Sequence, residues 1–285
     1  MTSLFRVGLL LTFRCNAMCS HCFFESGPHR NEVMSTDLGI KAIDEAAVLG
    51  AEWISFTGGE PFLEQDLLET LGAYANELGL KTEIVSNGFW AETPEKAESA
   101  LVPLWGLGLD VLNLSIDDFH QEYVPIQQVK NAYDAAKKLG LKIVIMTTTS
   151  KNNKLTAEKI PELLPDEKIL IMGRSRVRDP NALLVETPVT PAGRGVSIED
   201  HEYTLMTEVQ CSEALRDIGI GPDGSVYPCC GPLAARITLG NLKESRLKEI
   251  LNRAKKDEFL ASIREGKPIS GAFTTRCHAC ISLLE

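Results

Sequence analysis

Short apolar runs alternate with longer segments in which apolar residues recur every three or four positions, and this pattern extends over the first 172 residues. The runs have the composition of buried strands, whereas the longer segments have the spacing of amphipathic helices. The predicted strands cover residues 5–13, 53–57, 81–86, 111–116, 141–149 and 168–172. The predicted helices cover residues 36–49, 64–78, 93–104, 126–139 and 156–164.

Strands that alternate with helices favour a parallel sheet with helical crossovers. Six such units are too few for a closed eight-stranded barrel. We therefore predict an α/β fold in which residues 1–175 form a partial (β/α)6 TIM-like barrel. In such sheets the functional groups lie at the carboxyl ends of the strands, which is where the polar motifs described below fall.

The pattern changes after residue 175. Prolines and glycines interrupt residues 176–205, so this segment is predicted to be a linker or an active-site loop. Residues 206–285 then contain a predicted β-hairpin at 219–227, with Asp223–Gly224 as its turn, and a predicted helix at 245–254. We expect them to form a small C-terminal domain.

The composition, with 44% hydrophobic and 24% charged residues in 285, is that of an ordinary globular protein. A formal net charge of −10 disfavours nucleic acid as a partner, because binding a phosphate backbone requires basic groups. No apolar run approaches about 18 residues, and the N-terminus lacks a signal peptide pattern. We therefore expect no membrane span and a cytoplasmic location.

Eight cysteines are distributed very unevenly along the chain. Three lie between residues 15 and 22, and five lie after residue 210. Structural disulfides are rare in the reducing cytoplasm. The sequence therefore predicts two separate thiolate clusters.

The first cluster, Cys15, Cys19 and Cys22, has the spacing C-x3-C-x2-C and directly follows the first predicted strand. Three thiolates on one tight loop can bind three irons of a [4Fe-4S] cubane, and the fourth iron is then open to a small molecule. Electron-transfer clusters, in contrast, usually have four cysteine ligands. The alternatives are buried free thiols or a zinc site with His21 as fourth ligand.

This triad resembles the signature of the radical S-adenosylmethionine (SAM) superfamily. A second matching feature is the segment Thr57-Gly58-Gly59-Glu60-Pro61, which ends the second predicted strand. Glycines allow the backbone to approach a ligand closely, and Glu60 can accept hydrogen bonds from an ammonium group. The resemblance implies that Gly58, Gly59, Glu60 and Pro61 hold the amino group of SAM.

The resemblance extends to later strand ends. Ser86 and Asn87 follow the third strand, and Ser115 and Asp117 lie at the end of the fourth. Such groups are similar to those that contact the ribose and carboxylate of SAM in the family, although these residue types also serve as turn formers. Two further assignments concern single residues: Arg174 is assigned to the methionine carboxylate, with Arg176 and Arg178 as rivals, and His21 to the adenine. The polar run at residues 117–122 is either a substrate or proton-transfer site or a solvated loop.

The family chemistry follows as an expectation. The reduced cluster cleaves SAM into methionine and a 5′-deoxyadenosyl radical, which abstracts a hydrogen atom from an unactivated carbon. The electron is expected from a donor such as flavodoxin or ferredoxin.

The later cysteines follow the pattern C-x12-G-x4-C and end in a C-x2-C pair. This arrangement resembles the auxiliary-cluster extension called SPASM, or its shortened twitch form. The full extension has seven cysteines, and this chain has fewer. We assign Cys211, Cys229, Cys277 and Cys280 to one auxiliary [4Fe-4S] cluster; a structural zinc site is the alternative.

Cys230 is left outside this assignment. It is a buried thiol, an alternative cluster ligand, or a donor of a hydrogen atom to a substrate radical. The last role would make the enzyme an epimerase.

Three functions remain open at this point. The first is modification of a peptide substrate by epimerisation or cross-linking. The second is a dehydrogenase or epimerase of a small molecule such as a sugar, aminocyclitol or amino acid, which the short tail favours somewhat. The third is a zinc-stabilised binding protein without enzymatic activity.

Overall fold

The computed structural model describes residues 4–174 and 177–284, and its main element is a curved sheet. Seven neighbouring strands in this sheet are parallel, in the order β1-β2-β3-β4-β5-β7-β6. Their bounds are Arg6–Thr12 (β1), Trp53–Gly58 (β2), Lys81–Ser86 (β3), Val111–Ser115 (β4), Lys142–Thr149 (β5), Ile169–Ile171 (β6) and Ala182–Pro188 (β7).

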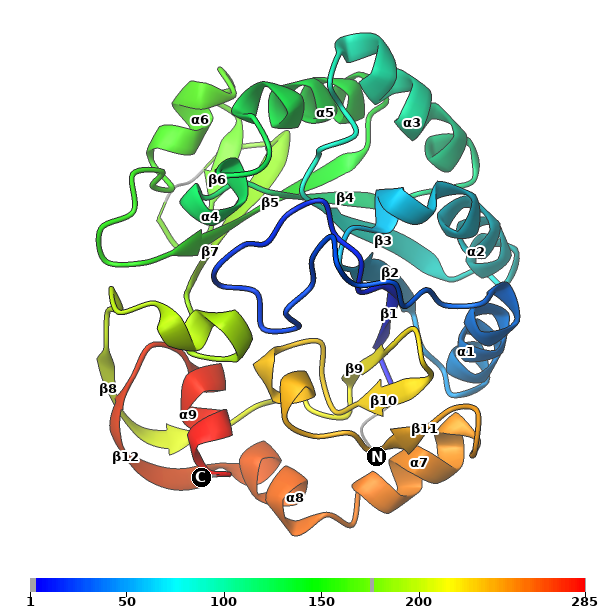
Figure 1. Ribbon diagram of the computed structural model, residues 1–285, viewed down its shortest axis with the longest axis vertical. Helices are drawn as coiled ribbons and strands as arrows, with labels where there is room; N and C mark the ends of the chain where they lie inside the picture. The colour runs from blue at the N-terminus through cyan, green and yellow to red at the C-terminus, as the bar shows by residue number, and fades with distance from the viewer. Residues whose placement is uncertain (1–3, 175–176, 285) are drawn as a thin grey trace.

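Helices cover the outer face of this sheet (Figure 1). They are α1 (Thr36–Val48), α2 (Gln65–Glu77), α3 (Pro94–Gly106), α5 (Ile126–Lys138) and α6 (Lys159–Leu163). The predicted partial barrel and all five predicted helices are confirmed, although α6 is shorter than expected. No helix in the described ranges is long and apolar enough to cross a bilayer.

The sixth barrel strand differs from the prediction. Residues 169–171 do form a strand, but β7 lies between it and β5, in register from Ile143–Ala182 to Thr149–Pro188. Part of the segment 176–205 is therefore a barrel strand, and the barrel extends past residue 175. Pro188 is tolerated because it is the last residue of the strand.

The C-terminal region joins the same sheet. The predicted hairpin is present as β9 (Asp217–Ile220) and β10 (Ser225–Tyr227), with Gly224 at a φ of 91° in the turn. β9 also pairs in parallel with β1, on the edge opposite β2. The hairpin therefore continues the barrel beyond its first strand, a contact that the sequence analysis did not foresee.

The remaining C-terminal elements are β8 (Thr204–Val209), β11 (Gly240–Asn241), α7 (Leu247–Ala254), α8 (Glu258–Glu265), β12 (Lys267–Phe273) and α9 (Arg276–Ser282). They surround the hairpin on one side only: β11 and α7 lie beside it, and β8 and β12 lie farther away, next to α9 (Figure 1). β8 and β12 form a separate two-stranded antiparallel sheet.

The two faces of the barrel sheet have different compositions. Val7 and Leu9 of β1 belong to the large apolar core beneath the helices. Because side chains alternate along a strand, Gly8 faces the inside of the barrel. Ser55 and Glu83 are its neighbours in register on β2 and β3, so the inner face carries polar groups.

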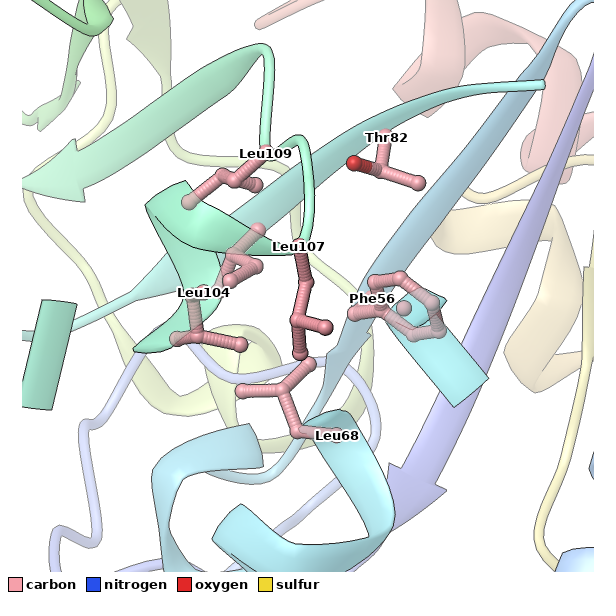
Figure 2. Close-up of a pocket in the computed structure, with 8 residues that line it drawn as sticks. Phe56, Leu68, Thr82, Leu104, Leu107 and Leu109 are labelled. Atoms are coloured by element: carbon pink, nitrogen blue, oxygen red, sulfur yellow. The ribbon is translucent and has the colours of Figure 1, made fainter. Parts of the chain in front are cut away.

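The core on the outer face contains one small gap between β2, β3, α2 and α3 (Figure 2). Leucines and Phe56 line most of it, and its volume is about 10 Å³. This is about the smallest space that can hold a single water molecule. The gap is a packing defect of the core and not a ligand site.

Candidate functional site

The first three cysteines lie on the loop between β1 and α1, which crosses the centre of the molecule over the barrel (Figure 1). Cys15 and Cys19 are buried, and Cys22 is half-buried. Backbone hydrogen bonds fix the loop, from Cys22 N to Cys19 O at 3.1 Å and from Cys15 N to Gly27 O at 3.2 Å. The loop therefore holds its three thiols without help from a disulfide.

The glycine motif lies directly against this loop. Gly59 N donates to Thr12 O at 2.7 Å, and Glu60 N donates to Arg14 O at 2.9 Å. Gly58 has a φ of 132°, and a Cβ atom on Gly59 would lie 2.0 Å from Arg14 O. Only glycine permits this approach. The two motifs, which are 36 residues apart from Cys22 to Gly58, therefore form one site.

Glu60 is a buried carboxylate with three donors. Its two oxygens accept from Ser86 Oγ at 2.9 Å, from Asn87 N at 2.9 Å and from Phe62 N at 3.2 Å. Burial raises the pKa of Glu60 to about 7, against the opposing effect of these hydrogen bonds. A carboxylate has about four acceptor positions, so one is left for a ligand.

Asn87 connects this carboxylate to the cysteine loop. Its side-chain amide donates to Asn16 Oδ1 at 2.9 Å and lies 3.8 Å from Cys15 Sγ. The sequence-predicted Ser86 and Asn87 are thus brought to the triad by the end of β3.

At the end of β4, Asp117 caps the short helix α4 (Asp118–Gln121) and accepts from Thr148 N at 3.2 Å. Both of its oxygens lie 2.9 Å from His120 Nδ1. Burial alone would raise the pKa of Asp117 and lower that of His120. Their mutual attraction outweighs burial, so the pKa of Asp117 is lowered and that of His120 is raised. Ser115 lies two residues earlier on the inner face of β4.

His21 lies on the cysteine loop and packs its ring against α4. Its ring lies 4.9 Å from the rings of both Phe119 and His120. Burial, reinforced by His120, lowers the pKa of His21 to about 4, so the imidazole is neutral at pH 7. Within the polar run 117–122, Asp117, Phe119 and His120 therefore lie against His21 of the cysteine loop, whereas Glu122 at the end of the run is exposed.

Arg174 does not join these residues. It forms ion pairs with Glu158 and Glu186, and its side chain is half exposed. Glu186 lies two residues after Leu184, whose side chain is in the outer core, so it faces away from the inside of the barrel. Of the two rivals, Arg176 falls outside the described residues, and Arg178 is almost fully exposed.

Four of the later cysteines form a second group. Cys277 and Cys280 lie one helical turn apart on α9. A Cβ atom on Gly231 would lie 3.7 Å from Cys229 Sγ and 3.9 Å from Cys277 Sγ. Burial, together with the nearby thiols of Cys229, Cys277 and Cys211, raises the pKa of Cys280 to about 12.

Cys230 is separate from this group. Its thiol donates to Ile218 O at 3.1 Å. It also fills the space above Gly8, where an added Cβ atom would lie 2.5 Å from the sulfur. Gly8 faces the inside of the barrel, so the Cys230 sulfur lies there too.

The spacing of the thiols tests which metal fits. In the described part of the chain, three candidate ligand atoms come within 4.8 Å of one another only at His21, Asp117 and His120. A tetrahedral zinc ion with 2.3 Å bonds would draw its thiolates to about 3.8 Å from one another. Neither group of thiols is therefore preformed as the compact ligand set of a tetrahedral zinc ion, and this is compatible with the larger cubane cluster.

Known protein families match both parts of the chain. The model of the radical SAM superfamily matches residues 9–164. The model of the SPASM iron–sulfur cluster-binding domain matches residues 211–281.

Individual proteins are also similar. YydG of Bacillus subtilis (strain 168), whose name assigns it provisionally to peptide biosynthesis, is 26% identical over 239 residues, which are 82% of this chain and 72% of YydG. The structure of SuiB of Streptococcus suis bound to SAM superposes on this chain with a TM-score of 0.64 and 16% identity, over 92% of this chain and 68% of SuiB. A second structure shows SuiB bound to the precursor peptide SuiA. BtrN bound to SAM and 2-DOIA has a TM-score of 0.54 at 15% identity, over 93% of this chain and 87% of BtrN.

Proposed function

Because this chain belongs to the radical SAM superfamily and carries a SPASM domain, we propose that it epimerises a residue of a peptide substrate, with Cys230 as the hydrogen-atom donor. Its cofactors are a catalytic [4Fe-4S] cluster, SAM and an auxiliary SPASM cluster. The position of Cys230, apart from the other four later cysteines and inside the barrel, is the observation that carries the proposal.

In this proposal Cys15, Cys19 and Cys22 hold the catalytic cluster, which with SAM supplies a 5′-deoxyadenosyl radical. Glu60 and the carbonyl groups of the glycine motif bind the ammonium group of SAM. Further polar contacts to SAM come from Ser86, Asn87, Ser115, Asp117 and His21. Cys211, Cys229, Cys277 and Cys280 hold the auxiliary cluster.

Epimerisation requires hydrogen removal from one side of a carbon and hydrogen delivery from the other. The triad lies at the carboxyl end of β1, and Cys230 lies beside Gly8 near its amino end. Gly8 and Thr12 are about 13 Å apart at 3.3 Å per residue. A substrate between them would face the radical on one side and the Cys230 thiol on the other.

The S–H bond of Cys230 breaks, and its hydrogen atom forms a new C–H bond on the substrate radical. The sulfur-centred radical that remains takes up one electron and one proton to restore the thiol. A one-electron donor of the flavodoxin or ferredoxin type would supply that electron.

A peptide substrate is supported by two similar proteins. YydG is named for peptide biosynthesis, and SuiB binds a precursor peptide. Both cover most of this chain.

The decisive experiment is incubation of the iron-loaded enzyme, SAM and a reductant with candidate peptides in deuterated water. The Cys230 thiol exchanges with solvent, so the epimer should gain one deuterium at a single carbon by mass spectrometry. Cys230→Ala should still form 5′-deoxyadenosine but no epimer. Deuterium gain that persists in this variant would contradict the donor role.

Cys280→Ala is the matched control. Loss of a proposed auxiliary ligand should remove about four irons per chain. Cys230→Ala should keep the wild-type iron content, since the proposal gives it no ligand role. An equal loss of iron in both variants would make Cys230 a ligand.

The second candidate function is dehydrogenation of a small molecule. BtrN, which binds the small molecule 2-DOIA, has the same fold and is matched over 87% of its length. A product two mass units lighter than the substrate, without deuterium gain, would favour this function over epimerisation.

A further inference from the structure

Residues 190–197, here called the bridge segment, connect the two cysteine groups. At one end, Thr190 Oγ1 lies 2.8 Å from Thr275 Oγ1, and Thr275 caps the helix α9 that carries Cys277 and Cys280. At the other end, the segment packs on the catalytic cysteine loop. The sequence alone predicts this stretch only as part of a linker or active-site loop.

Arg194 makes the contacts to the catalytic loop. Its Nε donates to Cys19 O at 3.0 Å, and its Nη2 donates to Ser26 O at 2.8 Å. Its backbone N donates to Cys22 O at 3.2 Å. One residue therefore holds the loop at three carbonyl groups, two of which belong to proposed cluster ligands.

The flanking glycines make this approach possible. Gly193 has a φ of 52°, and a Cβ atom there would lie 2.5 Å from Phe23 O and 2.8 Å from Cys22 O. The sequence Gly-Arg-Gly therefore brings the segment's backbone against the loop before the arginine side chain is placed.

The charge of Arg194 is not neutralised by an ion pair. Within residues 4–174 and 177–284, its side-chain partners are carbonyl oxygens, and no carboxylate lies in ion-pair distance of it. An arginine is always protonated at physiological pH. A full positive charge is thus fixed beside the thiols of a cluster that must accept an electron.

We propose that Arg194 is a positioning residue of the catalytic cluster, which holds the cysteine loop and raises the cluster's reduction potential through its charge. The reduced cluster is more negative than the oxidised one by one charge, so a nearby cation stabilises the reduced form more. Cluster potentials depend on net charge and on hydrogen bonding around the sulfurs. The proposal rests on the cluster site and not on the identity of the substrate.

Two substitutions separate the charge from the hydrogen bonds. Arg194→Gln removes the charge and keeps an amide donor, whereas Arg194→Lys keeps the charge and loses the planar fork. Arg178→Gln makes the same change in net charge at a residue that is almost fully exposed. It serves as the control for remote electrostatic effects.

The measurement is an anaerobic redox titration of the iron-loaded full-length protein, followed by electron paramagnetic resonance. The signal that changes on addition of SAM identifies the catalytic cluster. We expect Arg194→Gln to shift the midpoint potential of the catalytic cluster to a lower value. At limiting reductant, a smaller fraction of this cluster should then be reduced. Arg194→Lys should restore the midpoint, and Arg178→Gln should leave it at the wild-type value.

Iron content is measured on the same samples. A wild-type midpoint in Arg194→Gln with full iron content would overturn the proposal. A midpoint lowered equally in the Gln and Lys variants would overturn the proposed effect of the charge, because the change in potential would then come from the geometry of the loop alone.

Discussion

At the residue scale, Glu60 shows how the site combines burial with hydrogen bonding. A buried carboxylate without partners would be strongly destabilised in its charged form. Three donors partly offset this, so that its pKa settles at about 7 and not at a higher value. The residue therefore changes charge near neutral pH.

The pKa of Glu60 near 7 predicts that the affinity for SAM depends on pH. The ammonium group of SAM favours the ionised carboxylate, so the affinity for SAM should be half its maximum near pH 7 and approach the maximum by pH 8. Below pH 7 Glu60 must first lose a proton, and affinity should fall by up to about tenfold per pH unit. Calorimetric titration of SAM into iron-loaded protein at pH 6 and pH 8 measures the change in affinity. Glu60→Gln should bind more weakly but with a flat profile, and an unchanged slope in that variant would assign the effect to another group such as His120.

A second residue-scale prediction concerns the glycine motif. Gly59→Ala would place a methyl group against Arg14 O, and such overpacking costs about 1–3 kcal/mol in the free energy of unfolding. Gly72→Ala in α2 is the control, because no atom lies within 4 Å of its added Cβ. That change should instead stabilise the helix by about 0.5–1 kcal/mol. Urea unfolding of both variants measures the difference, and equal stabilities would contradict the packing argument.

At the element scale, hydrophobic periodicity was sufficient for β1 to β5 and for the helices between them. It was insufficient for β7, because its apolar run is only Ala182–Val185, and prolines at 180 and 188 indicated a break. What makes this segment a strand is pairing with β5 along its whole length. That is a tertiary effect, which no local pattern encodes.

The helix α9 depends on its cap in a testable way. Thr275 Oγ1 accepts from His278 N at 3.0 Å and also contacts Thr190. Thr275→Ala should cost about 1 kcal/mol in the free energy of unfolding, and it should loosen the segment that carries Cys277 and Cys280. Thr275→Ser keeps the hydroxyl and should behave as the wild type. Iron retention during dialysis against a chelator compares them; identical retention in all three proteins would show that the cap does not support the cluster.

At the scale of the whole molecule, the sequence predicted the parts of the site but not how they meet. Cysteine spacing and the Gly-Gly-Glu-Pro motif identified the cofactor-binding loops, because their chemistry is local. The location of Cys230 depends on the pairing of β9 with β1, more than 200 residues away in the chain. Likewise, Arg194 reaches the cysteine loop only through the folded bridge segment.

The two-cluster organisation predicts that iron binding is additive. The wild-type protein should hold about eight irons per chain, from two cubanes. Replacement of Cys15, Cys19 and Cys22 by Ala should leave about four irons and abolish 5′-deoxyadenosine formation, because the iron that binds SAM is lost.

Replacement of the four auxiliary cysteines, Cys211, Cys229, Cys277 and Cys280, should also leave about four irons per chain. SAM binding, measured by calorimetry, should survive this replacement because the triad and Glu60 lie on a separate loop and strand end. Zinc in place of iron in either variant would contradict the assignment of iron–sulfur clusters. Loss of all iron in both variants would contradict independent clusters, because the sheet shared by β1 and β9 would then couple their assembly.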